Sequence, residues 1–211
     1  MAFKSAPADA IVAESPDRLL RDLTRRRIPD VLPHQAEIMR AYAELPSNLP
    51  DVALQLPTGS GKTLVGLLIA EWRRRKYRER VVYLCPTRQL VHQVVDQAQE
   101  RYGLTVGTFV GAQRDYPPAN RTDYQQAERV AITTYSALFN TNSFFDNADV
   151  IVLDDAHAAE NYVAQHWTLR VERFRAEHAA LHQALCAVLA PYLAAHDLAL
   201  LRGEWEDVVD R

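Results

Sequence analysis

The sequence predicts an α/β fold, in which a mostly parallel sheet is covered by helices, followed by a C-terminal helical segment. Two observations support this fold class. Five short apolar runs, each of a length typical of a buried strand, alternate with helical or loop segments between residues 52 and 153. This alternation is typical of a parallel sheet with both faces covered. After about residue 158 the β-rich runs stop, and no glycine occurs before Gly203.

The elements can be placed in order from apolar periodicity and from helix and strand breakers. Residues 1–14 are small and alanine-rich, which predicts a loose lead-in, and Ser15-Pro16-Asp17 predicts a helix start. A second helix is expected from Pro33 to Leu45. The polar stretch 112–127, with its Pro-Pro pair, is expected to be a loop, and Pro191 to divide the C-terminal helices. Strands are expected at 52–56, 81–85, 104–110, 129–133 and 149–153, and further helices at 62–75, 88–102 and 135–139.

Composition narrows the class of protein. The chain has 211 residues, 48% hydrophobic and 24% charged, which fits a globular domain with attachments. A net charge of −3 excludes a generally basic chain, so any nucleic-acid site must be a local patch. The cysteines, Cys85 and Cys186, form no CxxC pattern, and the N-terminus has no apolar signal core. We therefore expect a cytoplasmic protein without a membrane span.

A glycine-rich stretch, Leu56-Pro57-Thr58-Gly59-Ser60-Gly61-Lys62-Thr63, lies between two apolar runs. Glycines allow backbone N–H groups to approach phosphate oxygens, and the helix that follows directs its positive end toward the same charge. Lys62 would supply a cation for the terminal phosphates, and Thr63 a hydroxyl for Mg²⁺. The pattern G-x-x-x-x-G-K-[ST] would place glycine at 56, where leucine stands. The stretch is therefore a Walker A variant and predicts a P-loop for ATP and Mg²⁺.

An acid pair completes the expected nucleotide site. The apolar run 150–153 ends in Asp154-Asp155. Asp154 would hold Mg²⁺, mostly through its water shell, and Asp155 would act on the attacking water. Carboxyl ends of parallel strands meet along one sheet edge, so this pair should lie near the glycine-rich stretch.

Two other clusters have competing interpretations. Arg25-Arg26-Arg27 either matches a helix C-terminal dipole or contacts nucleic acid, and the sequence leaves both open. His178 and His182 have the i, i+4 spacing that can hold zinc on a helix. No glutamate follows His178 and no third ligand is evident in the sequence, so we do not expect a metal there.

Several segments, in order, resemble the first motor domain of superfamily 2 helicases of the DEAD/DEAH-box type. The stretch from Pro57 to Thr63 resembles motif I of this family, in which leucine at the position of Leu56 is normal. Pro86-Thr87-Arg88-Gln89-Leu90-Val91-His92-Gln93 is similar to motif Ia. Asp154-Asp155-Ala156-His157 is similar to the DEAH box, and together with motif I it makes the resemblance specific. Two similarities are weak when taken alone, that of Ile132-Thr133-Thr134-Tyr135 to motif Ib and that of Leu32-Pro33-His34-Gln35 to the adenine-reading segment.

The resemblance implies a RecA-like P-loop domain over residues 31–160, after a lead-in and helix at 1–30. It implies an ATP hydrolase of helicase type that couples hydrolysis to movement on DNA or RNA. In this family Gln35 would contact adenine, His157 would couple the ATP site to a neighbouring motor domain, and catalysis would rest on Lys62, Asp154 and Asp155. ATP would be held by Pro57, Thr58, Gly59, Ser60, Gly61, Lys62 and Thr63, the metal by Thr63 and Asp154, and the nucleic-acid backbone by Pro86, Thr87, Arg88, Gly111 and Thr134.

The sequence departs from this family in two respects. Asp155 stands where the family usually has glutamate, so the attacking water would be held less well. No S-A-T motif and no arginine-finger motif follows residue 160, so a second RecA-like motor domain is expected as a partner outside this sequence. These departures leave open an alternative, a nucleotide- or nucleic-acid-binding module without productive catalysis.

The C-terminal part and the glycine-rich stretch each allow one more comparison. Residues 161–211 form a helical extension or the start of an insertion, since Asn161-Tyr162 through Arg173 is loosely similar to the insertion of XPD/DinG-type helicases.

A small P-loop kinase would share the glycine-rich stretch. Pro86-Thr87-Arg88 and the Asp-Asp-Ala-His box argue against a kinase.

Overall fold

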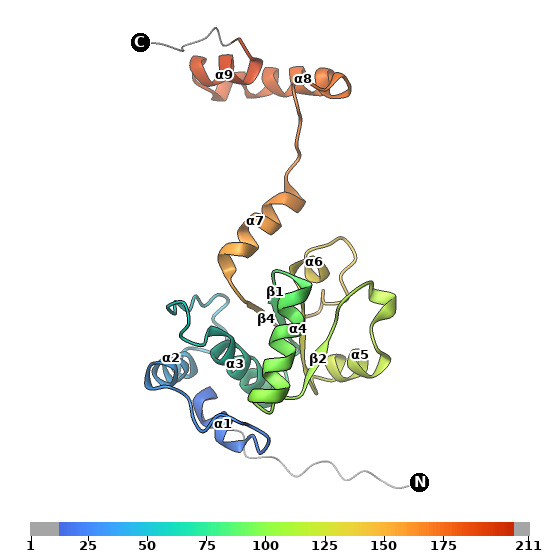
Figure 1. The fold of residues 1–211 in the computed structure, drawn as a ribbon. Coiled ribbons are helices and arrows are strands. Elements are labelled where there is room, and N and C mark those ends of the chain that lie inside the picture. The colour runs from blue at the N-terminus through green and yellow to red at the C-terminus, as the bar shows by residue number, and fades with distance from the viewer. Residues whose placement is uncertain (1–12, 205–211) are drawn as a thin grey trace. The chain divides into compact units, whose positions relative to one another are not determined.

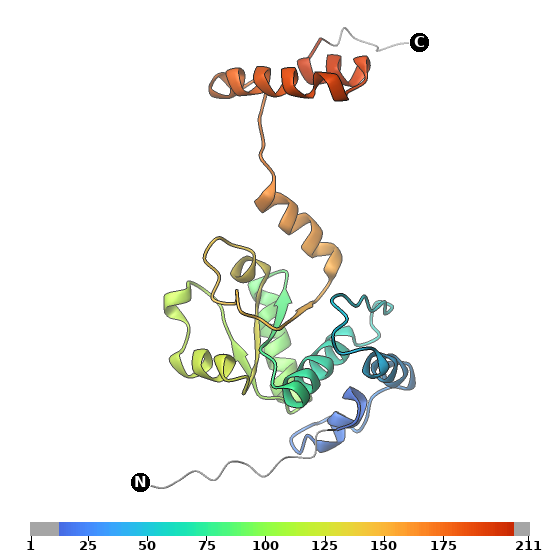
Figure 2. The same ribbon diagram turned by 180° about the vertical axis from the view of Figure 1, so that it is seen from behind.

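The computed structural model describes residues 13–204, so most of the expected lead-in lies outside the described residues. The chain divides into two compact units, Met1–His166 and Trp167–Arg211, which are described separately. Figures 1 and 2 show the first unit as strands surrounded by helices and the second as a helical unit.

The first unit contains a four-stranded sheet with the order β2-β3-β1-β4. All pairs are parallel, and Tyr83 of β1 lies opposite Ile132 of β3 and Val152 of β4. The strands are β1 (Val81–Cys85), β2 (Val106–Thr108), β3 (Val130–Thr134) and β4 (Val150–Leu153). The sheet confirms the predicted α/β class, with parallel strands at four of the expected positions.

Helices cover both faces of this sheet. Alternate side chains of β1 enter different cores, because successive residues of a strand point to opposite faces. Tyr83 joins a core with Leu20, Leu68 and Val94 from the helices, while Leu84 joins a core with Phe109 and other aromatic residues. The helices of this unit are α1 (Pro16–Asp22), α2 (Pro33–Glu44), α3 (Lys62–Tyr77), α4 (Arg88–Asp96) continued by a π-helix (Gln97–Arg101), a 3₁₀ turn (Gln113–Asp115), α5 (Pro118–Gln125), α6 (Tyr135–Leu138) and α7 (Ala156–Trp167).

The strand predicted at 52–56 is wrong for this structure. Residues 51–57 have no strand conformation, and Val52 and Leu54 are 38% and 40% exposed. Only Leu56 enters the core. An apolar run becomes a strand only when a neighbouring chain segment accepts its backbone hydrogen bonds, and the described residues provide none here.

The loop predicted at 112–127 is also wrong in part, because this stretch holds a 3₁₀ turn and α5. Pro118 occupies the first turn of α5, where a missing N–H costs nothing and the fixed φ favours a helix. The Pro-Pro pair therefore starts a helix instead of excluding one. Residues 168–172, expected to be helical, have no helical conformation.

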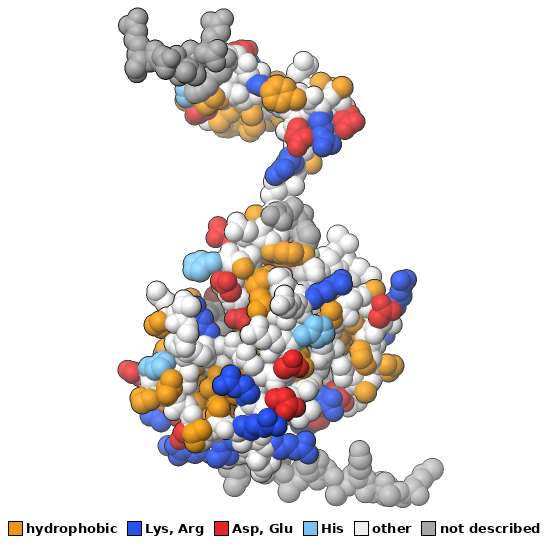
Figure 3. Space-filling view, viewed as in Figure 1, with side chains coloured by type: hydrophobic (Ala, Val, Ile, Leu, Met, Phe, Trp, Pro, Cys, Tyr) orange, Lys and Arg blue, Asp and Glu red, His pale blue; other side chains and the backbone are white. Residues whose placement is uncertain are grey.

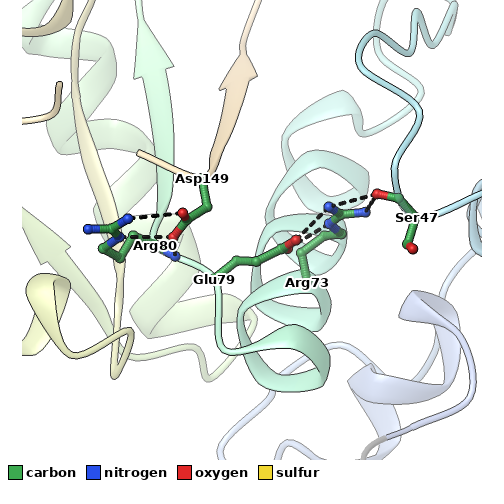
Figure 4. A network of polar contacts seen from close by, with 5 residues as sticks. All are labelled: Ser47, Arg73, Glu79, Arg80 and Asp149. Atoms are coloured by element: carbon green, nitrogen blue, oxygen red, sulfur yellow. Dashed lines mark hydrogen bonds and ion pairs between the residues drawn. The ribbon is translucent and has the colours of Figure 1, made fainter. Parts of the chain in front are cut away.

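Ion pairs fix the turn between α3 and β1 (Figure 4). Arg73 makes a two-pronged contact with Glu79 at 2.7 Å and also donates to the Ser47 carbonyl. The backbone N–H and guanidinium of Arg80 both donate to the Asp149 carboxylate, which stands just before β4. These hydrogen bonds hold the pKa of Asp149 below its usual range. The contacts tie the start of β1 to the start of β4.

The arginine triplet lies at the end of the unit away from the carboxyl ends of the strands. The backbone N–H of Arg27 donates to the carbonyl of Arg101, at the far end of the helix that begins after β1. Arg26 donates to the carbonyls of Arg21 and Leu23 at the end of α1. Figure 3 shows basic side chains gathered over α1 in this region. This arrangement favours the helix-end interpretation of the triplet.

The second unit contains a 3₁₀ turn (Ala176–His178), α8 (Ala179–Leu189), another 3₁₀ turn (Ala190–Tyr192) and α9 (Ala195–Arg202). Pro191 lies between α8 and α9, as predicted. The helices of this unit leave large apolar side chains in solvent, with Val188 65% and Tyr192 83% exposed. Between residues 13 and 204, no helix is both long and apolar enough to cross a bilayer.

Candidate functional site

The glycine-rich stretch forms a tight turn that leads into α3. Gly59 and Gly61 have φ values of +79° and +81°, a left-handed conformation that residues with a Cβ rarely adopt. The Ser60 hydroxyl and backbone N–H both donate to the Pro57 carbonyl, at 2.6 and 3.2 Å. Lys62 is the first residue of α3, so its side chain and the free N–H groups of the helix start are at the same place. This geometry suits an anion.

Gln35, in α2, connects this turn to the helix by a hydrogen bond. Its side-chain Nε2 donates to the Ser60 carbonyl at 2.7 Å, and its Oε1 accepts from the Leu32 backbone N–H at 2.9 Å. The residue is only 4% exposed, and a Cβ at position 61 would collide with its amide nitrogen. Both ends of the amide are thus engaged within the chain. The structure places Gln35 beside the turn, with its amide facing the backbone.

The acid pair stands at the carboxyl end of β4. The Asp154 backbone N–H donates to the Leu84 carbonyl of β1 at 3.0 Å, so the sheet ladder extends to the first acid. Asp155 has a φ of +57°, which turns the chain sharply into α7. The buried Tyr135 hydroxyl donates to the carbonyl oxygens of both Asp154 and Asp155, at 3.0 Å for Asp155. The pair is therefore held by backbone contacts on two sides.

Electrostatic interactions link the start of α3 to the acid pair. Burial raises the pKa of Asp154 above its usual range, and the neighbouring Asp155 raises it further, while the Tyr83 hydroxyl and the charge of Lys62 lower it. Burial also raises the pKa of Tyr83, whose hydroxyl interacts with both Asp154 and Thr63. Burial, together with the charge of Asp154, raises the pKa of the Cys85 thiol to about 12. The charge of Lys62 thus acts on Asp154, and Thr63 and Asp154 both interact with the Tyr83 hydroxyl.

The donor set around Asp154 fits Mg²⁺. Magnesium takes oxygen ligands and keeps several waters, so one carboxylate and one hydroxyl suffice when phosphate oxygens complete the shell. Asp154 and Thr63 offer those oxygens beside Lys62. Within the described part of the chain, no three His, Cys, Asp or Glu side chains are grouped to hold a metal alone. His178 is instead engaged through Nδ1, which accepts from the Glu172 backbone N–H at 3.1 Å.

A hollow lies near the carboxyl ends of β1, β2 and β3. It has a volume of about 240 Å³ and includes Arg88, Gly111 and Thr134, three of the residues predicted to contact a nucleic-acid strand. Thr87 instead caps α4, where its hydroxyl oxygen accepts from the Leu90 backbone N–H at 3.2 Å. Pro86 and Thr87 do not line the hollow. The other lining residues are Phe109, Gln113, Tyr116, Ser136, Ala137, Asn140, Asn142 and Phe144.

Sequence reasoning missed several residues of these sites. The amide side chains of Gln113, Asn140 and Asn142 line the hollow, although they lie in polar stretches without a recognisable spacing. Tyr83 and Tyr135 sit in apolar, buried segments and read as core residues. Only their position beside the acid pair shows a role. His157, predicted to couple domains, is exposed in the first turn of α7.

Comparisons with known proteins agree with this architecture. Residues 32–189, more than half of the chain, match the family model described as DEAD/DEAH box helicase. The crystal structure of the UvsW helicase from bacteriophage T4 shares the fold, with a TM-score of 0.54 at 16% identity over 72% of this chain and 53% of that one. The protein named Endoribonuclease Dicer homolog 3b, from Oryza sativa subsp. japonica, is 35% identical over 106 residues, 47% of this chain. This chain spans 6% of that protein's length.

The parallel sheet, the glycine-rich turn and the acid pair define a helicase-type ATP-binding domain with a RecA-like fold. The chain belongs to the DEAD/DEAH box helicase family.

Proposed function

We propose that this chain is the ATP-binding half of a motor that couples ATP hydrolysis to movement along a nucleic-acid strand. The observation that carries the proposal is the meeting of Lys62 and Thr63 with Asp154 at the carboxyl ends of parallel strands. A phosphate cradle beside a metal-binding acid is what phosphoryl transfer requires, because the reaction depends on positioning and on charge stabilisation.

Each residue of the site takes a defined part in this proposal. The backbone from Pro57 to Gly61 binds phosphate oxygens, and Lys62 neutralises the terminal phosphate. Thr63 and Asp154 hold Mg²⁺, which stabilises the charge that develops on the leaving group. Asp155 orients the attacking water. Gln35 keeps the turn in its binding conformation through Ser60 and is proposed to contact the adenine.

The hollow beside α4 is the proposed binding place for a strand of DNA or RNA. Arg88 offers a charge for a phosphate, and Thr134 offers a hydroxyl. Pro86 and Thr87 stand at the start of α4, whose N-terminal end also favours a phosphate. Such contacts grip a backbone without reading bases, which suits a motor that moves along many sequences.

A second RecA-like domain is part of the same proposal, because hydrolysis in this family involves two motor domains that close on ATP. His157 is proposed to face that partner, since it is exposed next to the acid pair. We also propose the division of the chain into a lead-in and helix at 1–30, an ATP-binding domain at 31–160 and a helical extension at 161–211.

Asp155 favours a second candidate function, a binding module without productive catalysis. The side chain of aspartate is one methylene shorter than that of glutamate. The left-handed backbone at Asp155 also fixes the direction in which this side chain leaves the chain. The variant Asp155→Glu separates the two functions. A large gain in ATP hydrolysis would favour the binding module, because the native site would then be degenerate. Unchanged or reduced hydrolysis would favour a working site built for aspartate.

The proposal is tested by measuring ATP hydrolysis with and without single-stranded DNA or RNA, in this chain and in a longer protein from the same locus. Stimulation by a strand in the longer protein supports a motor. Nucleotide binding is measured in parallel by calorimetry. The variant Lys62→Ala should bind nucleotide at least tenfold more weakly, while Lys76→Ala, at the other end of α3, should bind normally. Equal binding by Lys62→Ala would reject the phosphate site.

A further inference from the structure

Tyr135 stands between the two candidate sites. It is the first residue of α6, immediately after β3, and its side chain is fully buried. Its neighbours in sequence, Thr134 and Ser136, both line the hollow beside Arg88, and their hydroxyls are 2.8 Å apart. The ring of Tyr135 extends away from that hollow to the acid pair. One residue therefore has its backbone at one site and its hydroxyl at the other.

The hydroxyl of Tyr135 holds the turn that carries the acids. It donates to the carbonyls of Asp154 and Asp155, the two peptide groups on either side of the left-handed residue. A residue with a Cβ adopts a φ of +57° only when surrounding contacts favour it. A hydrogen bond to the flanking carbonyls is such a contact. A phenol hydroxyl is protonated at neutral pH and is therefore able to donate.

The ring itself is fixed in place. Its centroid lies 6.0 Å from that of Tyr162 on α7 and 6.5 Å from that of Phe139. A shift of the backbone at Thr134 or Ser136 cannot be absorbed by free rotation of a packed ring. Such a shift must move the hydroxyl relative to the acid pair.

We propose that Tyr135 is a positioning residue that couples strand binding in the hollow to Mg²⁺-nucleotide binding at Asp154. A strand that contacts Thr134 and Ser136 holds residues 134–136 where the Tyr135 hydroxyl favours the left-handed turn, and so keeps Asp154 in its metal-binding position. This inference rests on the proposed function, since it requires both sites. In this inference, the coupling between the two ligands operates within this chain and does not require a second motor domain.

The prediction is a reciprocal change in affinity, because coupling between two sites acts equally in both directions. We expect a saturating single strand to strengthen Mg²⁺-nucleotide binding by about tenfold, within the usual range of such coupling. This strengthening of nucleotide binding should vanish when Mg²⁺ is removed with EDTA. The Asp154-Asp155 turn positions the acid that binds the metal, and it does not change the glycine-rich turn that binds the phosphates directly.

The experiment measures the affinity of the full chain for a non-hydrolysable ATP analogue, with and without a DNA or an RNA oligonucleotide. The variant Tyr135→Phe keeps the ring and removes the hydroxyl. It should bind the strand alone as the native chain does and bind Mg²⁺-nucleotide alone no more tightly than the native chain, with the coupling reduced to less than twofold. Tyr124→Phe is the matched control, because Tyr124 is also buried but its hydroxyl donates to the Asn147 side chain, at 3.5 Å, whereas the Tyr135 hydroxyl donates to the acid pair.

The outcomes separate this inference from the proposed function. If the native chain binds neither nucleotide nor strand, the proposed function fails and the coupling fails with it. If it binds both without coupling, or if Tyr135→Phe keeps the coupling, only the role of Tyr135 is overturned. A second measurement does not depend on the variant folding. Hydrogen exchange of the native segment 154–157 should slow when a strand is added without nucleotide, and unchanged exchange would also overturn the role.

Discussion

The two acids at the end of β4 are under different constraints, one on the backbone conformation of Asp155 and one on the charge of Asp154. Asp155 must adopt a left-handed conformation, which short polar side chains tolerate better than longer ones. In the proposed role, Asp154 binds Mg²⁺ in its charged form, although burial opposes that charge. The backbone of this turn therefore gives a physical reason for aspartate at position 155, where related helicases usually carry glutamate.

The first prediction concerns the backbone at Asp155. Asp155→Asn should leave thermal stability unchanged, because asparagine adopts the left-handed region readily. Asp155→Glu should lower the free energy of unfolding by about 0.5–1 kcal/mol, since a longer side chain gains no local hydrogen bond in this conformation. Urea denaturation checks both variants. Equal stability of the glutamate variant would show that the turn does not select the side chain.

The second prediction concerns the charge of Asp154. Its folded-state pKa lies above the unfolded value, so the native state binds protons more tightly and stability falls as pH rises through this interval. Asp154→Asn removes the ionisation and should raise the melting temperature at pH 7, with the difference shrinking below the usual aspartate pKa. The same variant should lose Mg²⁺-dependent nucleotide binding. A lower melting temperature at pH 7 would contradict the burial penalty.

At the scale of elements, α3 joins the candidate phosphate site to the core. Its first turn carries Lys62 and Thr63, and its last turn carries the basic run that begins at Arg73. The structure shows this run engaged within the chain. Glu71 accepts hydrogen bonds from both Arg74 and Arg75 at 2.7 Å, and Arg74 also donates to the Ala127 carbonyl. The run therefore anchors α3, which holds the glycine-rich turn at a constant position.

The third prediction tests this anchor. The Glu71 side chain is 5% exposed and that of Arg74 is 11% exposed, so removal of the carboxylate leaves a buried cation without its partner. Glu71→Gln should lower the free energy of unfolding by about 3 kcal/mol, as for other broken buried pairs. Glu37→Gln, on the exposed side of α2, should change it by less than about 0.5 kcal/mol. Chemical denaturation of both variants measures the difference.

At the scale of the whole molecule, the candidate residues belong to one unit. The glycine-rich turn, the acid pair and the hollow beside α4 all lie within Met1–His166. The unit Trp167–Arg211 has its own helices, and its apolar side chains are more exposed than those of the sheet core. The proposed nucleotide site therefore lies within the first unit.

The fourth prediction follows from this division. A fragment that ends at His166 should bind Mg²⁺-nucleotide within twofold of the full chain, because it keeps every residue proposed to contact the nucleotide. Calorimetry of the two proteins provides the test. A tenfold loss of affinity would mean that the second unit takes part in the site, and the division into independent units would then be wrong for function.

The sequence by itself determined the fold class and the chemical groups of the candidate nucleotide site. Apolar runs, glycines and helix breakers act locally, and they predicted β1, β3, β4, α3 and α4. A motif such as Gly59-Ser60-Gly61-Lys62-Thr63 combines its chemistry within a few residues. The same local signals failed for 52–56, because strand formation depends on a neighbouring segment that no local pattern specifies.

Only the tertiary structure decided which side chains from distant segments meet. Gln35 joins Ser60, Tyr135 joins the acid pair, and Arg88 shares a hollow with Asn142. In the sequence, Tyr135 and Asn142 read as ordinary core and loop residues, and no pattern pairs Gln35 with Ser60. Contacts between residues far apart in the chain arise from strand order and from the packing of helices on the sheet, and these are set by the whole core. The groups of the site were therefore readable in the sequence, whereas the contacts that hold and link them were not.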